Sequence, residues 1–182
     1  MILRLLITIF CAVLFSSGCY LPINGRVVDA RTQQPIEGAI VLVEWTKKHG
    51  FGDAWTESYK VVETVSDKDG IVNIAGCYSP FVEKPAVTVY KKGYVAWNDE
   101  NIFPGWAKRT DFRWGNYVFK LERFKEEYSY TDHQMFTSRA INDTIGWENK
   151  KTFIKNYENA ERDMIIKEQN KKDQSKMRSP LR

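Results

Sequence analysis

Residues 23–123 contain a succession of short segments rich in β-branched and aromatic residues, and this succession restricts the fold more than any other feature of the sequence. Turn-forming residues separate the segments: Pro35 and Gly38 lie in one turn, and Gly70 lies in another. Many short strands joined by regular turns are typical of a mainly β, antiparallel sandwich. The expected strands cover residues 23–29, 39–45, 59–65, 71–75, 86–91 and 116–121.

The N-terminal segment has the pattern of a secretory signal. Arg4 supplies a positive charge, residues 5–15 form an apolar run interrupted only by Thr8, and small residues precede Cys19. A signal peptide has an apolar stretch of about 7–15 residues, whereas a membrane-spanning helix needs about 20. We therefore predict that residues 1–18 are a signal peptide and that the protein is exported.

Residues 14–19, with the sequence Leu-Phe-Ser-Ser-Gly-Cys, resemble the lipobox of bacterial lipoproteins. The resemblance implies that Cys19 carries diacylglycerol and that cleavage occurs just before it, which leaves residues 19–22 as a lipidated linker. Its acyl chains would hold the protein on a membrane, because each buried methylene contributes about 0.8 kcal/mol. By resemblance to enterobacterial lipoproteins, Tyr20 rather than Asp after the cysteine implies the outer membrane, facing the periplasm. The alternative is an ordinary secretory signal in which Cys19 is incidental.

Charge says little about the partner, whereas the cysteine content limits the fold. Lys and Arg number 27 against 23 Asp and Glu in a chain of 182 residues. This mildly basic balance points to no particular partner, and nucleic acid is not expected for an exported chain. Once Cys19 is acylated, Cys77 is the remaining thiol, so the fold has to rest on its core rather than on a disulfide. We expect Cys77 to be a buried small hydrophobe; the alternative is a reactive or intermolecular thiol.

Residues 124–170 have a helical pattern instead of the β pattern. Thr131 or Asp132 is a suitable cap for a first helix that ends near Asn142. A second helix is predicted over residues 151–169, where apolar residues recur at three- and four-residue spacing. Residues 171–182 form a basic tail that we expect to be disordered.

Four fragments of the β region, taken in order, resemble a carboxypeptidase regulatory-like domain. The fragments are Gly-Arg-Val-Val-Asp with Pro-Ile-Glu-Gly-Ala over residues 25–43, residues 64–74, the Gly-Tyr strand end over residues 87–94, and residues 117–121. The resemblance implies a transthyretin-like, seven-stranded Greek-key sandwich over residues 23–123. Two segments depart from it as long loops, residues 46–58 and 99–115, and loops of this kind commonly carry function.

Motifs of catalysis are missing from the sequence. The chain has two histidines, His49 and His133, and neither belongs to a His-x-x-Glu pair that zinc hydrolases use. No Gly-x-Ser-x-Gly or phosphate-binding loop is present. We therefore predict a protein that is not an enzyme and has no cofactor or metal; an enzyme with an unrecognised site is the least favoured alternative.

Tryptophan and arginine side chains at the two long loops are the candidate ligand-binding groups. Aromatic rings stack on sugar faces or anchor protein interfaces, although the same rings also pack loops onto a sandwich. We predict an envelope lipoprotein that acts as a binding or assembly module for envelope proteins or glycans. The alternative is an accessory protein that binds carbohydrate or peptidoglycan through its loop aromatics. The candidate residues are Trp55, Trp106, Trp114, Arg109 and Arg113.

Overall fold

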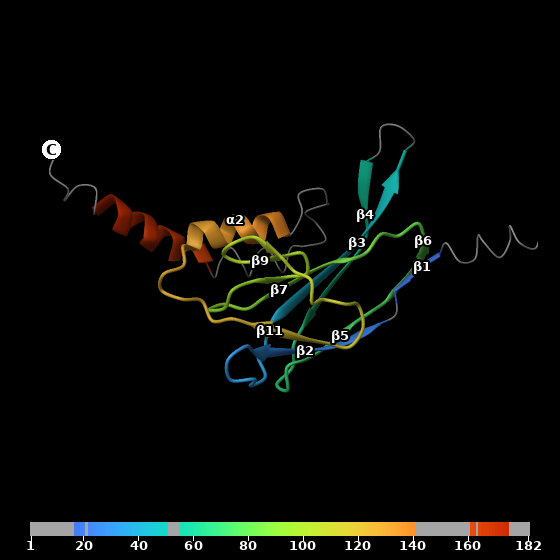
Figure 1. Ribbon diagram of the computed structural model, residues 1–182, viewed down its shortest axis with the longest axis horizontal. Helices are drawn as coiled ribbons and strands as arrows, with labels where there is room; N and C mark the ends of the chain where they lie inside the picture. The colour runs from blue at the N-terminus through green and yellow to red at the C-terminus, as the bar shows by residue number, and fades with distance from the viewer. Residues whose placement is uncertain (1–16, 21, 51–54, 141–160, 163, 175–182) are drawn as a thin grey trace, which may run out of the picture.

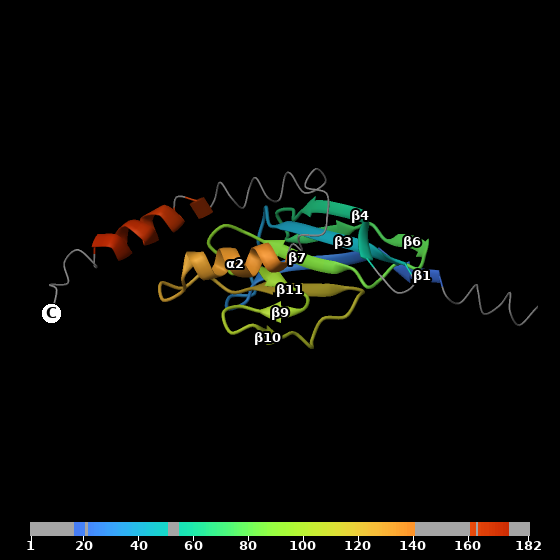
Figure 2. The same cartoon turned by 90° about the horizontal axis from the view of Figure 1, so that it is seen from above.

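The computed structural model describes residues 17–20, 22–50, 55–140, 161–162 and 164–174. Within these residues, a three-stranded and a four-stranded β-sheet face one another, with α2 (Tyr130–Ala140) on the outer side of the larger sheet (Figures 1 and 2). The predicted fold class, a mainly β sandwich of seven strands with a C-terminal helical extension, is confirmed. The smaller sheet has the order β11 (Tyr117–Leu121), β2 (Ile23–Asp29), β5 (Ile71–Ile74), and the larger sheet has the order β4 (Trp55–Val65), β3 (Ile40–His49), β7 (Ala86–Tyr90), β8 (Trp97–Asn98).

Strand β3 lies at the centre of the arrangement because its first six residues are buried on both faces. Val41, Val43 and Trp45 point into the core between the two sheets. Ile40 and Leu42 point the other way, into a second core that α2 covers with Phe136. Since alternate residues of a strand point to opposite faces, the apolar run over residues 40–43 requires a layer on each side of the larger sheet.

The core between the sheets depends on a close approach at Gly25 of β2. A Cβ atom at this position would come within 2.6 Å of Cε2 of Phe119, which is a fully buried residue of β11. Strands β2 and β11 are parallel, with Gly25 paired to Tyr117 in register. The prediction of an antiparallel sandwich is therefore wrong for this pair, because the local alternation that marks a strand carries no information about the direction of its neighbour.

The predicted long loop over residues 46–58 belongs largely to a β-hairpin. Strands β3 and β4 stay paired as far as His49 and Trp55, with a bulge at Trp45 and Thr46, and residues 51–54 lie outside the described residues. The predicted loop over residues 99–115 contains two short paired strands, β9 (Asn101–Ile102) and β10 (Ala107–Lys108), and a cis peptide bond between Phe103 and Pro104.

Helix α2 begins two or three residues earlier than the predicted caps Thr131 and Asp132 imply. Its cap is Ser129, whose Oγ accepts a hydrogen bond from the Asp132 amide at 3.2 Å, so the predicted caps Thr131 and Asp132 lie inside the first turn. Residues 161–162 and 164–174 are also helical. The helix thus extends into the predicted disordered tail as far as residue 174, and residues 151–160 of the predicted second helix lie outside the described residues.

The carboxylate of Glu168 joins these two helical segments. It accepts hydrogen bonds from Ser129 Oγ at 2.9 Å and from the Tyr130 amide at 2.8 Å, and Lys172 forms an ion pair with it at 2.6 Å. The first amides of a helix have no partner within the helix. A side chain from the later segment therefore completes the N-terminal cap of α2.

A small antiparallel ladder, which the sequence analysis did not predict, adjoins the sandwich. It pairs β1 (Ser17–Tyr20) with β6 (Cys77–Pro80), and Cys19 is in register with Tyr78. Strand β1 therefore extends across the predicted cleavage point and the predicted linker. Cys77 is buried in the main core, as expected for a small hydrophobe, and burial raises the pKa of its thiol. Among the described helices, none is both long and apolar enough to cross a membrane.

The buried carboxylate of Asp29 connects the end of β2 to the segments that follow β7 and β11. Its Oδ1 accepts hydrogen bonds from the backbone amides of Arg31 and Thr32, and its Oδ2 accepts one from Arg123 Nε at 2.7 Å and one from Tyr94 Oη at 3.3 Å. The Thr32 amide, together with Arg123 and against the cost of burial, holds the pKa of Asp29 well below its usual value of 3.8.

We expect Asp29 to make the stability of the protein sensitive to acid. A carboxyl with a lowered pKa stabilises the folded state above its unfolded pKa, and this contribution is lost as the pH falls through the folded pKa. Asp29→Asn should therefore lower the free energy of unfolding at about pH 6 and reduce its further decrease between about pH 4 and pH 2. Denaturant titrations at several pH values measure both effects. The control is Asp69→Asn, because Asp69 is an exposed carboxylate in a turn. Equal acid sensitivity of Asp29→Asn and the wild type would contradict this assignment.

Candidate binding site

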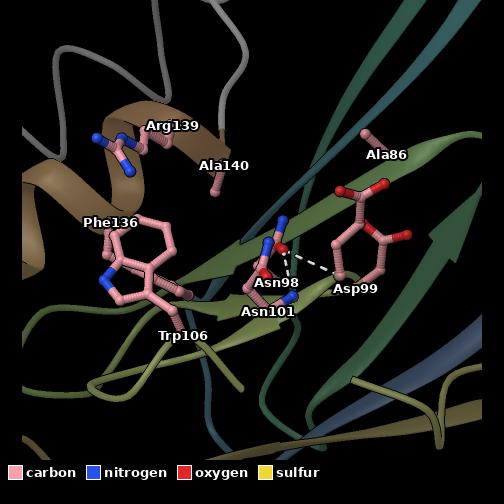
Figure 3. Close-up of a pocket in the computed structure, with 9 residues that line it drawn as sticks. Ala86, Asn98, Asp99, Asn101, Trp106, Phe136, Arg139 and Ala140 are labelled. Atoms are coloured by element: carbon pink, nitrogen blue, oxygen red, sulfur yellow. Dashed lines mark hydrogen bonds between the residues drawn. The ribbon is translucent and has the colours of Figure 1, made fainter. Parts of the chain in front are cut away.

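A pocket of about 250 Å³ lies where the C-terminal end of α2 meets the segment that follows β8 (Figure 3). Helix α2 supplies one wall, and residues 98–101 with Trp106 supply the other. The wall combines aromatic carbon with amide, carboxylate and guanidinium groups, which is the composition of a site for a small polar ligand. Its lining residues are Ala86, Asn98, Asp99, Glu100, Asn101, Trp106, Phe136, Arg139 and Ala140.

The Trp106 side chain is held at the pocket by contacts with α2. Its ring lies 5.1 Å from the ring of Phe136, and the guanidinium carbon of Arg139 lies 5.1 Å from its centroid. The backbone of Trp106 has a φ of 56°, in the left-handed region that non-glycine residues seldom adopt. The side chain is nevertheless 38% exposed, so a large aromatic surface is fixed in place and open to a ligand.

The floor of the pocket is held by a polar turn. Asn98 Oδ1 accepts hydrogen bonds from the backbone amides of Glu100 and Asn101, both at 2.9 Å. The buried Asp99 carboxylate accepts one from the Val87 amide at 2.9 Å and forms an ion pair with Lys84 at 2.9 Å. These contacts use the side chains of Asn98 and Asp99 to fix the turn, which places Asn101 and Glu100 at the pocket.

A buried hydrogen-bond chain positions α2 over the larger sheet. His133 Nε2 accepts a hydrogen bond from the Ala96 amide at 2.9 Å, and His133 Nδ1 lies 3.1 Å from Glu161 Oε2. Since a backbone amide only donates, the proton of the ring resides on Nδ1 and is donated to Glu161. Tyr90 donates to the other oxygen of Glu161 at 3.2 Å. In the sequence His133 stood out only as a candidate zinc ligand, and this structural role was not predicted.

The predicted ligand-binding residues do not form one site. Trp106 lies at the pocket, whereas Trp55 is 60% exposed on β4, where its ring stacks on His49 at 5.5 Å. Trp114 is half-buried with its ring 5.7 Å from that of Trp45 in the main core.

The two predicted arginines differ in their surroundings. Arg109 Nε donates to the Asn98 carbonyl at 2.7 Å, and its guanidinium lies 4.5 Å from the centre of the Trp97 ring. Its side chain is only 12% exposed, so Arg109 supports the floor of the pocket from behind. Arg113 is exposed and is not among the lining residues.

Sequence reasoning missed three lining residues that matter most: Asn101, Phe136 and Arg139. Asn101 begins β9, and the other two lie on α2 at a spacing of three residues, which places them on one helix face. That spacing could have shown that Phe136 and Arg139 share a helix face. The sequence of α2 does not, however, indicate which loop this face contacts. Among the described residues, no group of three or more His, Cys, Asp or Glu side chains could hold a metal ion.

Comparison with known proteins does not assign the chain to a family. No protein-family model matches it, and no curated protein does. A streptococcal ancillary pilin is 18% identical, with a TM-score of 0.32, over 59% of this chain and 30% of the pilin. The group B streptococcus pilus 2b backbone protein is 17% identical, with a TM-score of 0.32, over 59% of this chain and 42% of that protein. The chain thus spans less than half the length of either pilin, and similarity at this level identifies neither family nor function.

We expect two of the candidate tryptophans, Trp114 and Trp55, to differ in their effect on stability. Trp114→Ala should lower the free energy of unfolding by about 2–4 kcal/mol, because it removes a ring packed against the core. Trp55→Ala should lower it by less than about 1 kcal/mol, because the side chain is mostly in solvent. Chemical denaturation followed by circular dichroism measures both values. Comparable decreases in the free energy of unfolding of the two variants would contradict the prediction that the buried fraction of each ring determines its contribution to stability.

Proposed function

We propose that this chain is a non-enzymatic lipoprotein of the bacterial cell envelope that acts as a binding module, anchored to the outer membrane through Cys19. The basic start, the apolar run and the lipobox-like residues 14–19 support export and acylation. The sandwich supports a binding role, since rigid scaffolds commonly carry binding residues on the segments between their strands.

The observation that carries the binding role is the fixed and exposed ring of Trp106 at a pocket. A ring that only packed a loop onto the sandwich would be covered, as the ring of Trp97 is. A ring held by Phe136 and Arg139 costs little conformational entropy when a ligand binds, because its position is already set. The pocket at Trp106 is therefore the ligand site in this proposal.

A carbohydrate or peptidoglycan fragment is the ligand class that the pocket favours over a protein partner. Trp106 offers an aromatic face for stacking on a sugar ring. Asn101, Glu100 and Arg139 offer an amide, a carboxylate and a guanidinium at the same pocket, and these groups hydrogen-bond to hydroxyl, acetamido and carboxylate groups. A pocket of this size fits one or two sugar units rather than a protein surface.

Acylation is tested by replacing the cysteine of the lipobox-like sequence. Cys19→Ala should abolish labelling with radioactive or clickable fatty acid and release the protein from the membrane fraction, because no thioether can form. Cys11→Ala is the matched control, since Cys11 lies inside the apolar run and is removed by the predicted cleavage. Labelling and fractionation of cells that express each variant measure the result. A Cys19→Ala protein that stays membrane-bound with unchanged mobility would show that the anchor is of another kind.

Ligand binding is tested with purified peptidoglycan and the detergent-solubilised lipoprotein. Trp106→Ala should weaken cosedimentation by about tenfold or more, which is the effect expected of a central aromatic contact. Trp55→Ala, a tryptophan outside the pocket, should bind like the wild type. Circular dichroism and melting temperature should show that both variants stay folded. Unchanged binding by folded Trp106→Ala would refute the pocket as the glycan site.

A further inference from the structure

Four large aromatic side chains on β4, on β6 and directly after β6 are exposed and are not part of the pocket. Trp55 and Tyr59 lie on β4 and are 60% and 47% exposed, Tyr78 lies on β6 and is 63% exposed, and Phe81 follows β6 and is 73% exposed. In both overall views, the outer part of the β3–β4 hairpin, β6 and β1 lie at the same end of the molecule, away from α2 (Figures 1 and 2). We call these four residues the aromatic end.

Contacts between the strands connect the segments that carry the aromatic end. The Glu83 amide donates to the Thr46 carbonyl at 2.9 Å, and Lys47 forms a β-bridge with Val82, so the chain that follows Phe81 runs along the hairpin. The Lys47 ammonium lies 3.7 Å from the centre of the Tyr59 ring. On the other side of the hairpin, Lys60 donates to the Gly76 carbonyl, next to β6.

The position of Cys19 indicates that the partner of the aromatic end is a lipid bilayer. Cys19 and Tyr20, the residues of β1 that follow the predicted cleavage point, pair in register with Tyr78 and Cys77, so the acylated residue would lie beside the strand that carries the exposed Tyr78. Only residues 20–22 separate Cys19 from the start of β2 at Ile23. A chain spans at most about 3.6 Å per residue, so this tether reaches only about 14 Å even when fully extended. An anchor this short would hold the neighbouring end of the sandwich close to the bilayer surface.

We propose that the aromatic end rests on the phospholipid surface and sets the orientation of the anchored protein. This inference depends on the acylation of Cys19 proposed above. Trp and Tyr side chains are enriched at membrane–water interfaces, where the ring lies among apolar groups and its polar atom among headgroups. Exposed aromatic residues that gather beside a lipid anchor therefore have a bilayer as their expected partner.

The charges at this end favour contact through the rings rather than through electrostatic attraction. Lys48 forms an ion pair with Glu83 at 2.7 Å, and His49 lies 3.1 Å from Glu57. Lys48 and His49 thus lie beside acidic groups, which leaves Lys47 on the Tyr59 ring and Lys60 on the Gly76 carbonyl. Attraction to anionic lipid depends on larger clusters, of about four to eight basic side chains. The contact should therefore form on zwitterionic lipid as readily as on anionic lipid.

Tryptophan quenching in vesicles tests this orientation. The lipidated protein is reconstituted into phosphatidylcholine vesicles with bromine on the acyl chains, which quenches only rings that reach the bilayer. The tryptophan fluorescence of the wild type should fall. In Trp55→Phe the quenched fraction of the fluorescence should be about half of the wild-type fraction or less, because Trp55 is the exposed tryptophan at this end. The matched control is Trp106→Phe, which removes the exposed tryptophan against α2 and should leave the quenched part unchanged.

The outcomes separate this inference from the proposed function. Absence of quenching in the acylated wild type, or an equal loss in Trp106→Phe, would overturn the orientation while leaving the anchor in place. A requirement for phosphatidylglycerol in the vesicles would also overturn it, since charge would then carry the contact. Failure of acylation itself is detected separately by fatty-acid labelling of Cys19, so the two proposals do not fail together.

Discussion

Burial of β3 on both faces is the constraint on which the rest of the structure depends. Val41 and Val43 require the smaller sheet on one side, and Ile40 and Leu42 require cover on the other. A fully buried aliphatic side chain contributes about 1.5–3 kcal/mol relative to an exposed one. A two-layer sandwich would leave the second set in water, so the helical extension is part of the folding unit rather than an appendage. The same requirement brings Phe136 to the sheet and thereby forms one wall of the pocket.

The cover that α2 provides is fixed by polar contacts as well as by apolar packing. Tyr90 of the sheet, Glu161 of the later helix and His133 of α2 form a continuous hydrogen-bond chain that ends on a backbone amide. A buried polar network stabilises one arrangement when all its members are paired, and loss of one member leaves the others unpaired in a medium of low dielectric constant. The chain therefore specifies the position of α2 over the sheet, and Glu168 at its N-terminus fixes the same helix from the later segment.

The strands were largely predictable from the sequence, whereas their partners and the pocket were not. The bounds of β2 were predicted correctly, because the buried Ile23, Gly25 and Val27 alternate with the exposed Asn24 and Arg26. The outer part of the hairpin was taken for a loop because Lys47, His49 and Glu57 have no apolar alternation; cross-strand ring and ion contacts hold it instead. The parallel pairing of β2 with β11, and the meeting of Trp106 with α2, join segments far apart in the chain, and no local pattern encodes such contacts. Arg109 was assigned to a ligand because its packing against Trp97 cannot be seen in the sequence.

The two proposed surfaces are compatible because the fold places them on different parts of the molecule. The pocket lies against α2, on the outer side of the larger sheet, whereas the aromatic end lies beside β1 and β6 (Figure 1). A protein resting on the bilayer through the aromatic end would leave the pocket open to the space above the membrane. With a tether of three residues between Cys19 and β2, such an orientation would be imposed by the short connection as well as by the aromatic contacts. The stiffness of the sandwich would then hold the pocket at a fixed height above the membrane, where a glycan layer could reach it.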